Sequence, residues 1–141
     1  MIKRLKQSQR ALSWLYLLNA SVLITHEIDS AYWEEWTLFG IPGGIQLFLV
    51  LNFPIVVLVL YGQQALVRGK LAGIVLSWVL VAGGLSAAGI HSYFIFSGDL
   101  SFRQPASVFL LVATFVLSLL QAAALVDAGI RARKAKSVGR S

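Results

Sequence analysis

The sequence predicts an all-α protein, a four-helix transmembrane bundle with both termini in the cytoplasm. The first observation is the composition: 57% of the 141 residues are hydrophobic and 13% are charged, whereas soluble domains carry about 25% charged residues. Such a chain has too little polar surface for a water-soluble globule, which excludes a cytosolic enzyme, a disordered protein and a DNA-binding domain. The other two observations are four long apolar segments and a one-sided distribution of basic residues.

The length corresponds to one domain, and we expect residues 1–141 to form a single integral membrane unit. A membrane-spanning helix needs about 20 mostly apolar residues. The expected spans are residues 11–31, 43–67, 71–96 and 105–128. The chain contains no cysteine, which excludes disulfides, thiolate metal sites and a cysteine nucleophile.

The first expected span contains the shortest apolar run, from Ala11 to Thr25. No helix breaker follows before Gly40, so the helix is expected to continue past His26. The basic start is typical of a signal peptide as well as of a first span. Because Ile24-Thr25-His26-Glu27 offers no small-x-small cleavage site, we expect an uncleaved helix.

The segment from Ala31 to Phe39 predicts a short interfacial helix, because it is rich in Trp and Tyr, which favour the headgroup level. The glycines and proline of Gly40-Ile-Pro-Gly-Gly44 then end this helix and begin the second span. Pro105 suits the first turn of the fourth helix, where its missing N–H costs nothing.

The basic residues predict the orientation of the chain. Four lie in the N-terminal tail, two in the connection between the second and third spans and five in the C-terminal tail, while Arg103 lies on the other side. The positive-inside rule therefore places both termini in the cytoplasm, and a bacterial inner membrane is the expected location. Most acidic residues lie on the outer side. The basic tails indicate topology and attraction to anionic lipid, and no nucleic-acid partner is expected.

Polar residues within a membrane are costly and mark candidate sites. Helical spacing places polar or small residues of three expected spans on one stripe of each helix. These stripes contain Leu12, Tyr16, Asn19, Leu23, His26, Ser30 and Trp33 in the first span, Gly73, Ser77, Gly84, Ala88 and His91 in the third, and Ser107, Thr114, Ser118 and Gln121 in the fourth. Because small residues let helices approach closely in lipid, His91 is expected to point into the bundle.

The first and third spans both run outward and each carries a histidine near its outer end, where the second span begins. We therefore expect His26, Asp29, His91 and Gln46 to share an outer-leaflet pocket. Asp29, three residues after His26, is placed to hydrogen-bond and orient its ring. Imidazole is the commonest metal ligand, which makes His26 and His91 candidates for a metal or haem. An apolar pocket with a few polar groups also suits a lipid or a quinone.

Simpler structural interpretations stand beside these. His26, Glu27 and Asp29 suit hydrated positions at a helix end, and the Ser/Thr stripe of the fourth span suits interhelical hydrogen bonding. Asn52 is expected to satisfy the backbone carbonyl that Pro54 leaves free. The sequence contains no phosphate-binding glycine loop, nucleophile elbow or catalytic triad, so it assigns no reaction and no cofactor.

The box Thr25-His26-Glu27-Ile28-Asp29-Ser30, followed by Glu35-Trp36 and Phe39, resembles an uncharacterised family of small bacterial membrane proteins. Its members carry a His-Glu-hydrophobic-Asp box at the end of the first span and then a Glu-Trp pair. The resemblance covers the first outer loop well and the remainder as a four-span pattern. It implies that His26, Glu27, Asp29, Glu35 and Trp36 are site residues, which we add to His91, Gln46 and Asn19, and it implies no particular reaction.

Two further resemblances leave alternatives open. Proteins named for a His-x-x-Glu-Glu motif have a similar layout, but Glu-Ile-Asp follows His26 here. Small multidrug exporters are also basic-inside four-span proteins, but they carry a carboxylate where this chain has Asn19. Besides a ligand-binding or catalytic site, the sequence thus permits a structural or accessory subunit that packs against a membrane partner, and a small transporter that acts as a homo-oligomer.

Overall fold

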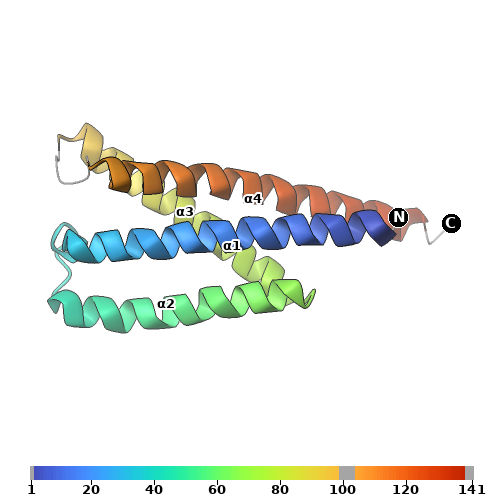
Figure 1. Ribbon diagram of the computed structural model, residues 1–141, viewed down its shortest axis with the longest axis horizontal. Helices are drawn as coiled ribbons and strands as arrows, with labels where there is room; N and C mark the ends of the chain where they lie inside the picture. Colours follow the sequence, from blue (N-terminus) through green and yellow to red (C-terminus); the bar gives the residue numbers. More distant parts are fainter. Residues whose placement is uncertain (1, 99–103, 139–141) are drawn as a thin grey trace.

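The computed structural model describes residues 2–98 and 104–138, and these form four long helices (Figure 1). The helices are α1 (Ile2–Tyr32), α2 (Gly44–Val67), α3 (Leu71–Phe96) and α4 (Pro105–Val138), with one 3-10 turn, η1 (Glu35–Thr37), between α1 and α2. The predicted all-α, four-helix bundle is confirmed. Asp99, Arg103 and Arg140, which entered the prediction of orientation, lie outside the described residues.

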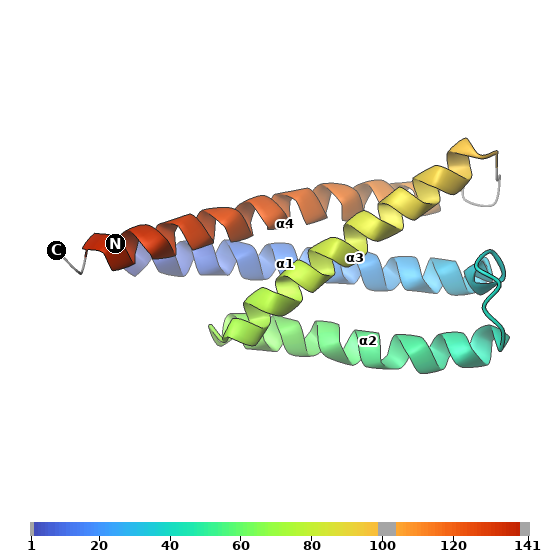
Figure 2. The ribbon, with the colours of Figure 1, turned by 180° about the vertical axis from the view of Figure 1, so that it is seen from behind.

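The helices have two distinct ends, which we call the terminal end and the loop end. Both chain termini lie at the terminal end, and the connection from α1 to α2 lies at the loop end (Figure 1). Seen from behind, α1 runs between α2 and α4, while α3 crosses diagonally from the terminal end of α2 toward the loop end of α4 (Figure 2). Within the described ranges, α1 and α3 each contact both α2 and α4.

The small residues of α3 permit its close approach to two neighbours. A Cβ atom at Gly73 would overlap the backbone of Leu66 on α2, and a Cβ atom at Gly84 would overlap the hydroxyl of Ser118 on α4. The whole predicted stripe of α3, including His91, is buried. These small residues therefore pack within the chain, so this stripe is not a surface for a partner protein.

Three of the four helices are long and apolar enough to cross a membrane: α2, α3 and α4. The protein is accordingly a multi-pass membrane protein, and its partner is the lipid bilayer. The second and third predicted spans match the observed helices within one residue. The fourth helix continues beyond the predicted residue 128 to Val138, through a basic segment. The first helix is not among the three, so its passage through the membrane stays a prediction.

The predicted interfacial helix from Ala31 to Phe39 is present only as the single 3-10 turn η1. Instead α1 continues to Tyr32, and the chain then turns sharply through Glu34, which has a positive φ of 52°, into η1. A left-handed residue cannot continue an α-helix. The physical reason is that this connection has to reverse direction within a few residues to begin α2 at Gly44. The predicted break at residues 40–44 and the start of α4 at Pro105 are confirmed.

The expected role of Asn52 is also wrong in detail. Its side-chain amide donates to the carbonyl of Phe48, one helical turn earlier, at 3.2 Å. The carbonyl that Pro54 deprives of its donor is that of Val50, because proline removes the N–H that would reach back four residues. Asn52 therefore reinforces the turn before the proline site and does not repair it.

Candidate metal centre at the loop end

A buried ion pair or hydrogen bond joins His91 of α3 to Glu35 of η1. The Nε2 atom of His91 lies 2.9 Å from Oε1 of Glu35. The Nδ1 atom of His91 lies 2.8 Å from the backbone carbonyl of Ala87, and a carbonyl oxygen only accepts hydrogen bonds. Nδ1 therefore carries a hydrogen and donates to Ala87. In neutral imidazole this leaves Nε2 with its lone pair directed at the Glu35 carboxyl group.

Two electron-rich atoms, Nε2 of His91 and a carboxylate oxygen of Glu35, cannot approach to 2.9 Å without a positive charge between or beside them. A proton supplies that charge in a hydrogen bond, and a metal ion supplies it in a coordination site. The backbone bond at Nδ1 is the orienting contact that metal-ligating histidines commonly make with their second nitrogen. His91 thus has the tautomer and orientation of a metal ligand.

His26 of α1 completes the cluster. Its ring meets the His91 ring edge to face, with centroids 4.8 Å apart and planes at 78°. It is 3% exposed, and its buried Nδ1 atom has no hydrogen-bond partner among the described residues. A buried polar atom without a partner costs about 1–3 kcal/mol, which makes His26 a candidate ligand residue. The predicted meeting of His26 and His91 is present in the structure.

The three side chains have the geometry of a small-ion site. One ligand atom from each of His26, Glu35 and His91 can be chosen so that all lie within 4.8 Å of one another, and all three residues are buried. Nitrogen and oxygen ligands of zinc lie about 2.0–2.2 Å from the ion, so two such ligands are about 3–3.5 Å apart. The cluster needs a small contraction to enclose an ion, chiefly at His26.

The local sequence explains how Glu35 reaches a histidine on another helix. The left-handed Glu34 turns the chain back over the end of α1, and the η1 turn follows, with Leu38 N–H bonded to the carbonyl of Glu35 at 3.0 Å. The Trp36 ring packs on Phe48 of α2, 5.4 Å between centroids, and holds the turn against the bundle. Glu35 is consequently 6% exposed although it lies in a connection.

The two remaining acidic candidates lie at the edge of the cluster. Glu27 is half-buried, interacts with the Asn52 side chain and is near enough to Glu35 and His91 to influence them electrostatically. Asp29 is also half-buried and contributes a negative charge near both histidines. The hydrogen bond expected from Asp29 is not made at Nδ1 of His26, which has no partner in the described part of the chain.

Other candidates lie apart from the cluster. Gln46 is exposed on the first turn of α2, so the expected pocket wall there is not formed. Asn19 is fully buried but belongs to another network. Its amide nitrogen donates to Oε1 of Gln121 at 2.9 Å and to the hydroxyl of Ser118 at 3.1 Å, and its carbonyl oxygen accepts from Thr114 at 3.1 Å. Trp36 supports the η1 turn and offers no ligand atom.

The helix stripes predicted the two histidines, but the pairing of Glu35 with His91 was not foreseen. Glu35 stood among the candidates because of the Glu-Trp pair of the family resemblance, with no geometric reason to face His91. The one signal in the sequence is a carboxylate beside an aromatic residue just before a run of glycines. A further buried group at this end, Ser107 near the start of α4, has an unpartnered hydroxyl, and sequence analysis assigned it to helix packing alone.

The fold and the buried cluster together define the class: a small multi-pass helical membrane protein with two histidines and a glutamate gathered at one end of its bundle. Within that class, the chain belongs to a family of unknown function, DUF6713, which matches residues 12–128. The chain matches no curated protein and no solved structure. The matched range includes all three cluster residues.

Proposed function

We propose that the protein binds a divalent first-row transition metal ion in the membrane, through His26, Glu35 and His91. The observation that carries the proposal is the buried, unpartnered Nδ1 of His26 beside a histidine whose other nitrogen is fixed by a backbone carbonyl. A metal ion would bind a ring nitrogen of His26 and balance the charge of Glu35. This is the metal alternative among the ligands that the sequence permits.

The donor set narrows the class of ion. Two imidazoles and one carboxylate suit zinc, iron, manganese, nickel or copper, and the absence of cysteine disfavours sites that depend on soft thiolates. Haem fits poorly, because the two histidine rings are in contact and a porphyrin between them would force them apart. Three protein ligands leave at least one coordination position open, as in catalytic metal sites. That open position would accept water or a polar group of a lipid or quinone.

The membrane placement belongs to the same proposal. We take α1 as a fourth span, because its apolar stripe is buried against α2 and α4 along the bundle. The basic residues at the terminal end favour its location in the cytoplasm. The metal centre then lies near the outer surface of a bacterial inner membrane, within reach of ions that arrive from outside.

Metal binding is tested on protein purified in mild detergent without a histidine tag. We expect one zinc ion per chain by elemental analysis after loading and desalting, and saturable Zn²⁺ binding by titration calorimetry. His91→Ala should lose this binding, because it removes the ligand whose orientation is fixed. Zinc-free wild-type protein that also fails to bind Zn²⁺, Mn²⁺, Co²⁺ and Ni²⁺ would overturn the proposal.

Glu34 and Glu35 provide a matched pair of carboxylates for the control. They are neighbours in the chain, but Glu34 is exposed and Glu35 is buried against His91. Glu35→Gln should weaken Zn²⁺ binding at least about tenfold, since the loss of a contact around a metal site costs about 10–100-fold in affinity. Glu34→Gln should leave affinity unchanged. Equal effects of both changes would indicate general electrostatic attraction instead of coordination.

A further inference from the structure

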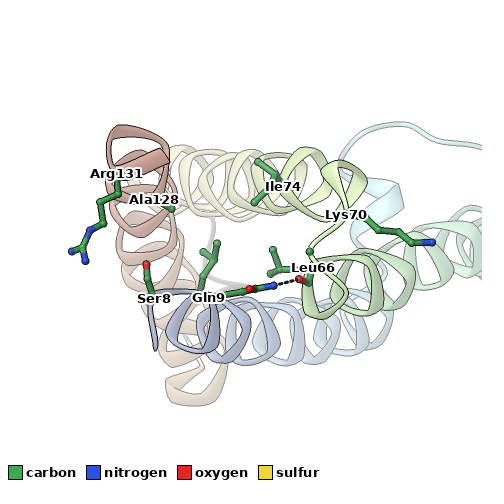
Figure 3. Close-up of a pocket in the computed structure, with 9 residues that line it drawn as sticks. Ser8, Gln9, Leu66, Lys70, Ile74, Ala128 and Arg131 are labelled. Atoms are coloured by element: carbon green, nitrogen blue, oxygen red, sulfur yellow. Dashed lines mark hydrogen bonds between the residues drawn. The ribbon is translucent and has the colours of Figure 1, made fainter. Parts of the chain in front are cut away.

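A cavity opens at the terminal end, opposite the metal centre. Its volume is about 250 Å³, and all four helices or their adjoining turns contribute to its lining. Figure 3 shows Ser8 and Gln9 of α1, Leu66 of α2, Ile74 of α3 and Ala128 of α4 around it. The Gln9 side chain crosses one side and donates to the Leu66 carbonyl at 3.3 Å. The cavity is thus open at one end of the bundle and is built by residues far apart in sequence.

The lining of the cavity is divided between an apolar floor and a polar rim. Leu12, Leu66, Ile74 and Ala128 form apolar surface, and Ser8 and Gln9 add neutral polar groups. Lys70 and Arg131 also line it, and Figure 3 shows their charged groups turned outward on opposite sides of the opening. A molecule bound in the cavity would therefore contact apolar surface inside it and positive charge at its mouth.

We infer that this cavity binds an acidic phospholipid, with its glycerol and acyl carbons against the apolar floor and its phosphate at the mouth, where the exposed side chains of Lys70 and Arg131 can turn inward to meet it. Basic pockets between transmembrane helices on the cytoplasmic side are known binding places for anionic headgroups. The mouth lies where α2 ends at Val67 and α3 begins at Leu71, which is the depth of the headgroups for spans of this length. The apolar floor favours a lipid over free phosphate.

The carboxylate of Asp127 competes with the phosphate for the guanidinium group of Arg131. Asp127 lies 2.7 Å from Arg131, one helical turn away, and both side chains are half-exposed. Exposed ion pairs of this kind contribute little, so a phosphate can share or displace the carboxylate. Lys70 has no such partner among the described salt bridges. Removing the Asp127 charge should strengthen lipid binding, a result that a purely structural rim would not give.

The first test compares phosphatidylglycerol, phosphatidylcholine and inorganic phosphate as additives to the full chain in mild detergent, with thermal unfolding as the readout. We expect phosphatidylglycerol alone to raise the Tm in a saturable way, because ligands that bind the folded state stabilise it. An equal rise with inorganic phosphate would assign the site to free anions and overturn the lipid inference. A rise with phosphatidylcholine of the same size would overturn the role of the two cations.

Variants then separate the cavity from general attraction to the basic end. Lys70→Gln with Arg131→Gln should weaken the phosphatidylglycerol response about 25-fold, since each basic residue near the surface contributes roughly a fivefold effect. Arg133→Gln with Lys134→Gln removes the same charge from exposed positions of α4 that do not line the cavity, and it should change the response little. Equal losses in the two double variants would overturn the inference.

Two single changes keep the test decisive if the first double variant does not fold. Ala128→Leu fills part of the cavity without a change in charge. It should abolish the phosphatidylglycerol response and leave the circular dichroism signal of the helices unchanged. Asp127→Asn should increase the apparent affinity at least about twofold. A full response in Ala128→Leu, or a weaker response in Asp127→Asn, would contradict the proposed site.

Discussion

Two buried polar clusters, one at the loop end and one in the middle of the bundle, use their hydrogen-bonding groups differently. In the middle, both polar atoms of Asn19 have partners on α4, and the amide of Gln121 continues the network to the carbonyl of Ser77 at 3.3 Å. At the loop end, His91 is fully engaged, but the buried Nδ1 of His26 has no partner within the described residues.

This difference distinguishes a cluster that stabilises the fold from a cluster that can bind a ligand. A fully satisfied polar network in an apolar interior holds helices in one arrangement and has no capacity left for another molecule. A cluster with an unpartnered buried nitrogen keeps an energetic cost that a ligand can remove. We therefore assign packing to the Asn19 network and metal binding to the cluster of His26, Glu35 and His91.

The largest effect is expected from His26→Phe. This change removes a proposed metal ligand and should lower Zn²⁺ affinity at least about 100-fold, because the remaining two ligands seldom hold a transition metal ion in proteins. The metal-free variant should be as stable as the metal-free wild type or more stable, because an unpartnered buried nitrogen is replaced by apolar ring atoms.

Titration calorimetry with Zn²⁺ and thermal unfolding in the presence of a chelator measure the two halves of this prediction separately. A variant that binds Zn²⁺ normally would remove His26 from the site. A variant that binds no metal but is also strongly destabilised without metal would indicate that His26 serves packing, as Asn19 does.

The second effect is the stabilisation of the wild type by its metal. At a free Zn²⁺ concentration about 100 times the Kd, the free energy of unfolding should rise by about 2.7 kcal/mol. The rise should disappear with a chelator and be absent from His91→Ala. It is measured as the shift of the unfolding midpoint in detergent. A midpoint that does not depend on Zn²⁺, in protein that binds the ion, would place the ion outside the folded bundle.

Asn19→Leu should give the opposite pattern to His26→Phe. Removing the amide leaves the buried side chains of Thr114, Ser118 and Gln121 without their common partner, and unmet buried groups cost about 1–3 kcal/mol. We expect the free energy of unfolding to fall by about 2 kcal/mol, with Zn²⁺ affinity unchanged. Loss of Zn²⁺ binding in a folded Asn19→Leu variant would show that the two clusters act as one unit.

The long apolar segments and their helical spacing were sufficient to predict most of the bundle. His26 and His91 were expected to meet because the first and third spans run in the same direction and each carries a histidine near the same end, and the two rings do lie in contact. Those positions depend on a repeat of 3.6 residues, which the sequence displays directly. Gln46 was misplaced because its position at the start of α2 indicated its depth but not the direction of its side chain.

The contribution of Glu35 could not be derived from periodicity. It depends on the left-handed conformation of Glu34 and on the path of the turn that follows, and non-glycine residues in that region give no clear sequence signal. The same segment was expected to form one short helix from Ala31 to Phe39, whereas it contains only the end of α1 and one 3-10 turn. Connections between spans are therefore where the sequence constrained this molecule least, although one of them supplies a proposed ligand.

The smallest effect compares a partnered with an unpartnered buried hydroxyl by one chemical change on one helix. Ser118 and Ser107 are both buried on α4, but the Ser118 hydroxyl interacts with Asn19 whereas the Ser107 hydroxyl has no partner in the described part of the chain. Ser118→Ala should lower the free energy of unfolding by about 0.6 kcal/mol, the average for hydrogen bonds between membrane helices. Ser107→Ala should leave it unchanged or slightly higher. Thermal unfolding of both variants without metal measures the difference, and equal losses would show that the Ser107 hydroxyl has a structural partner after all.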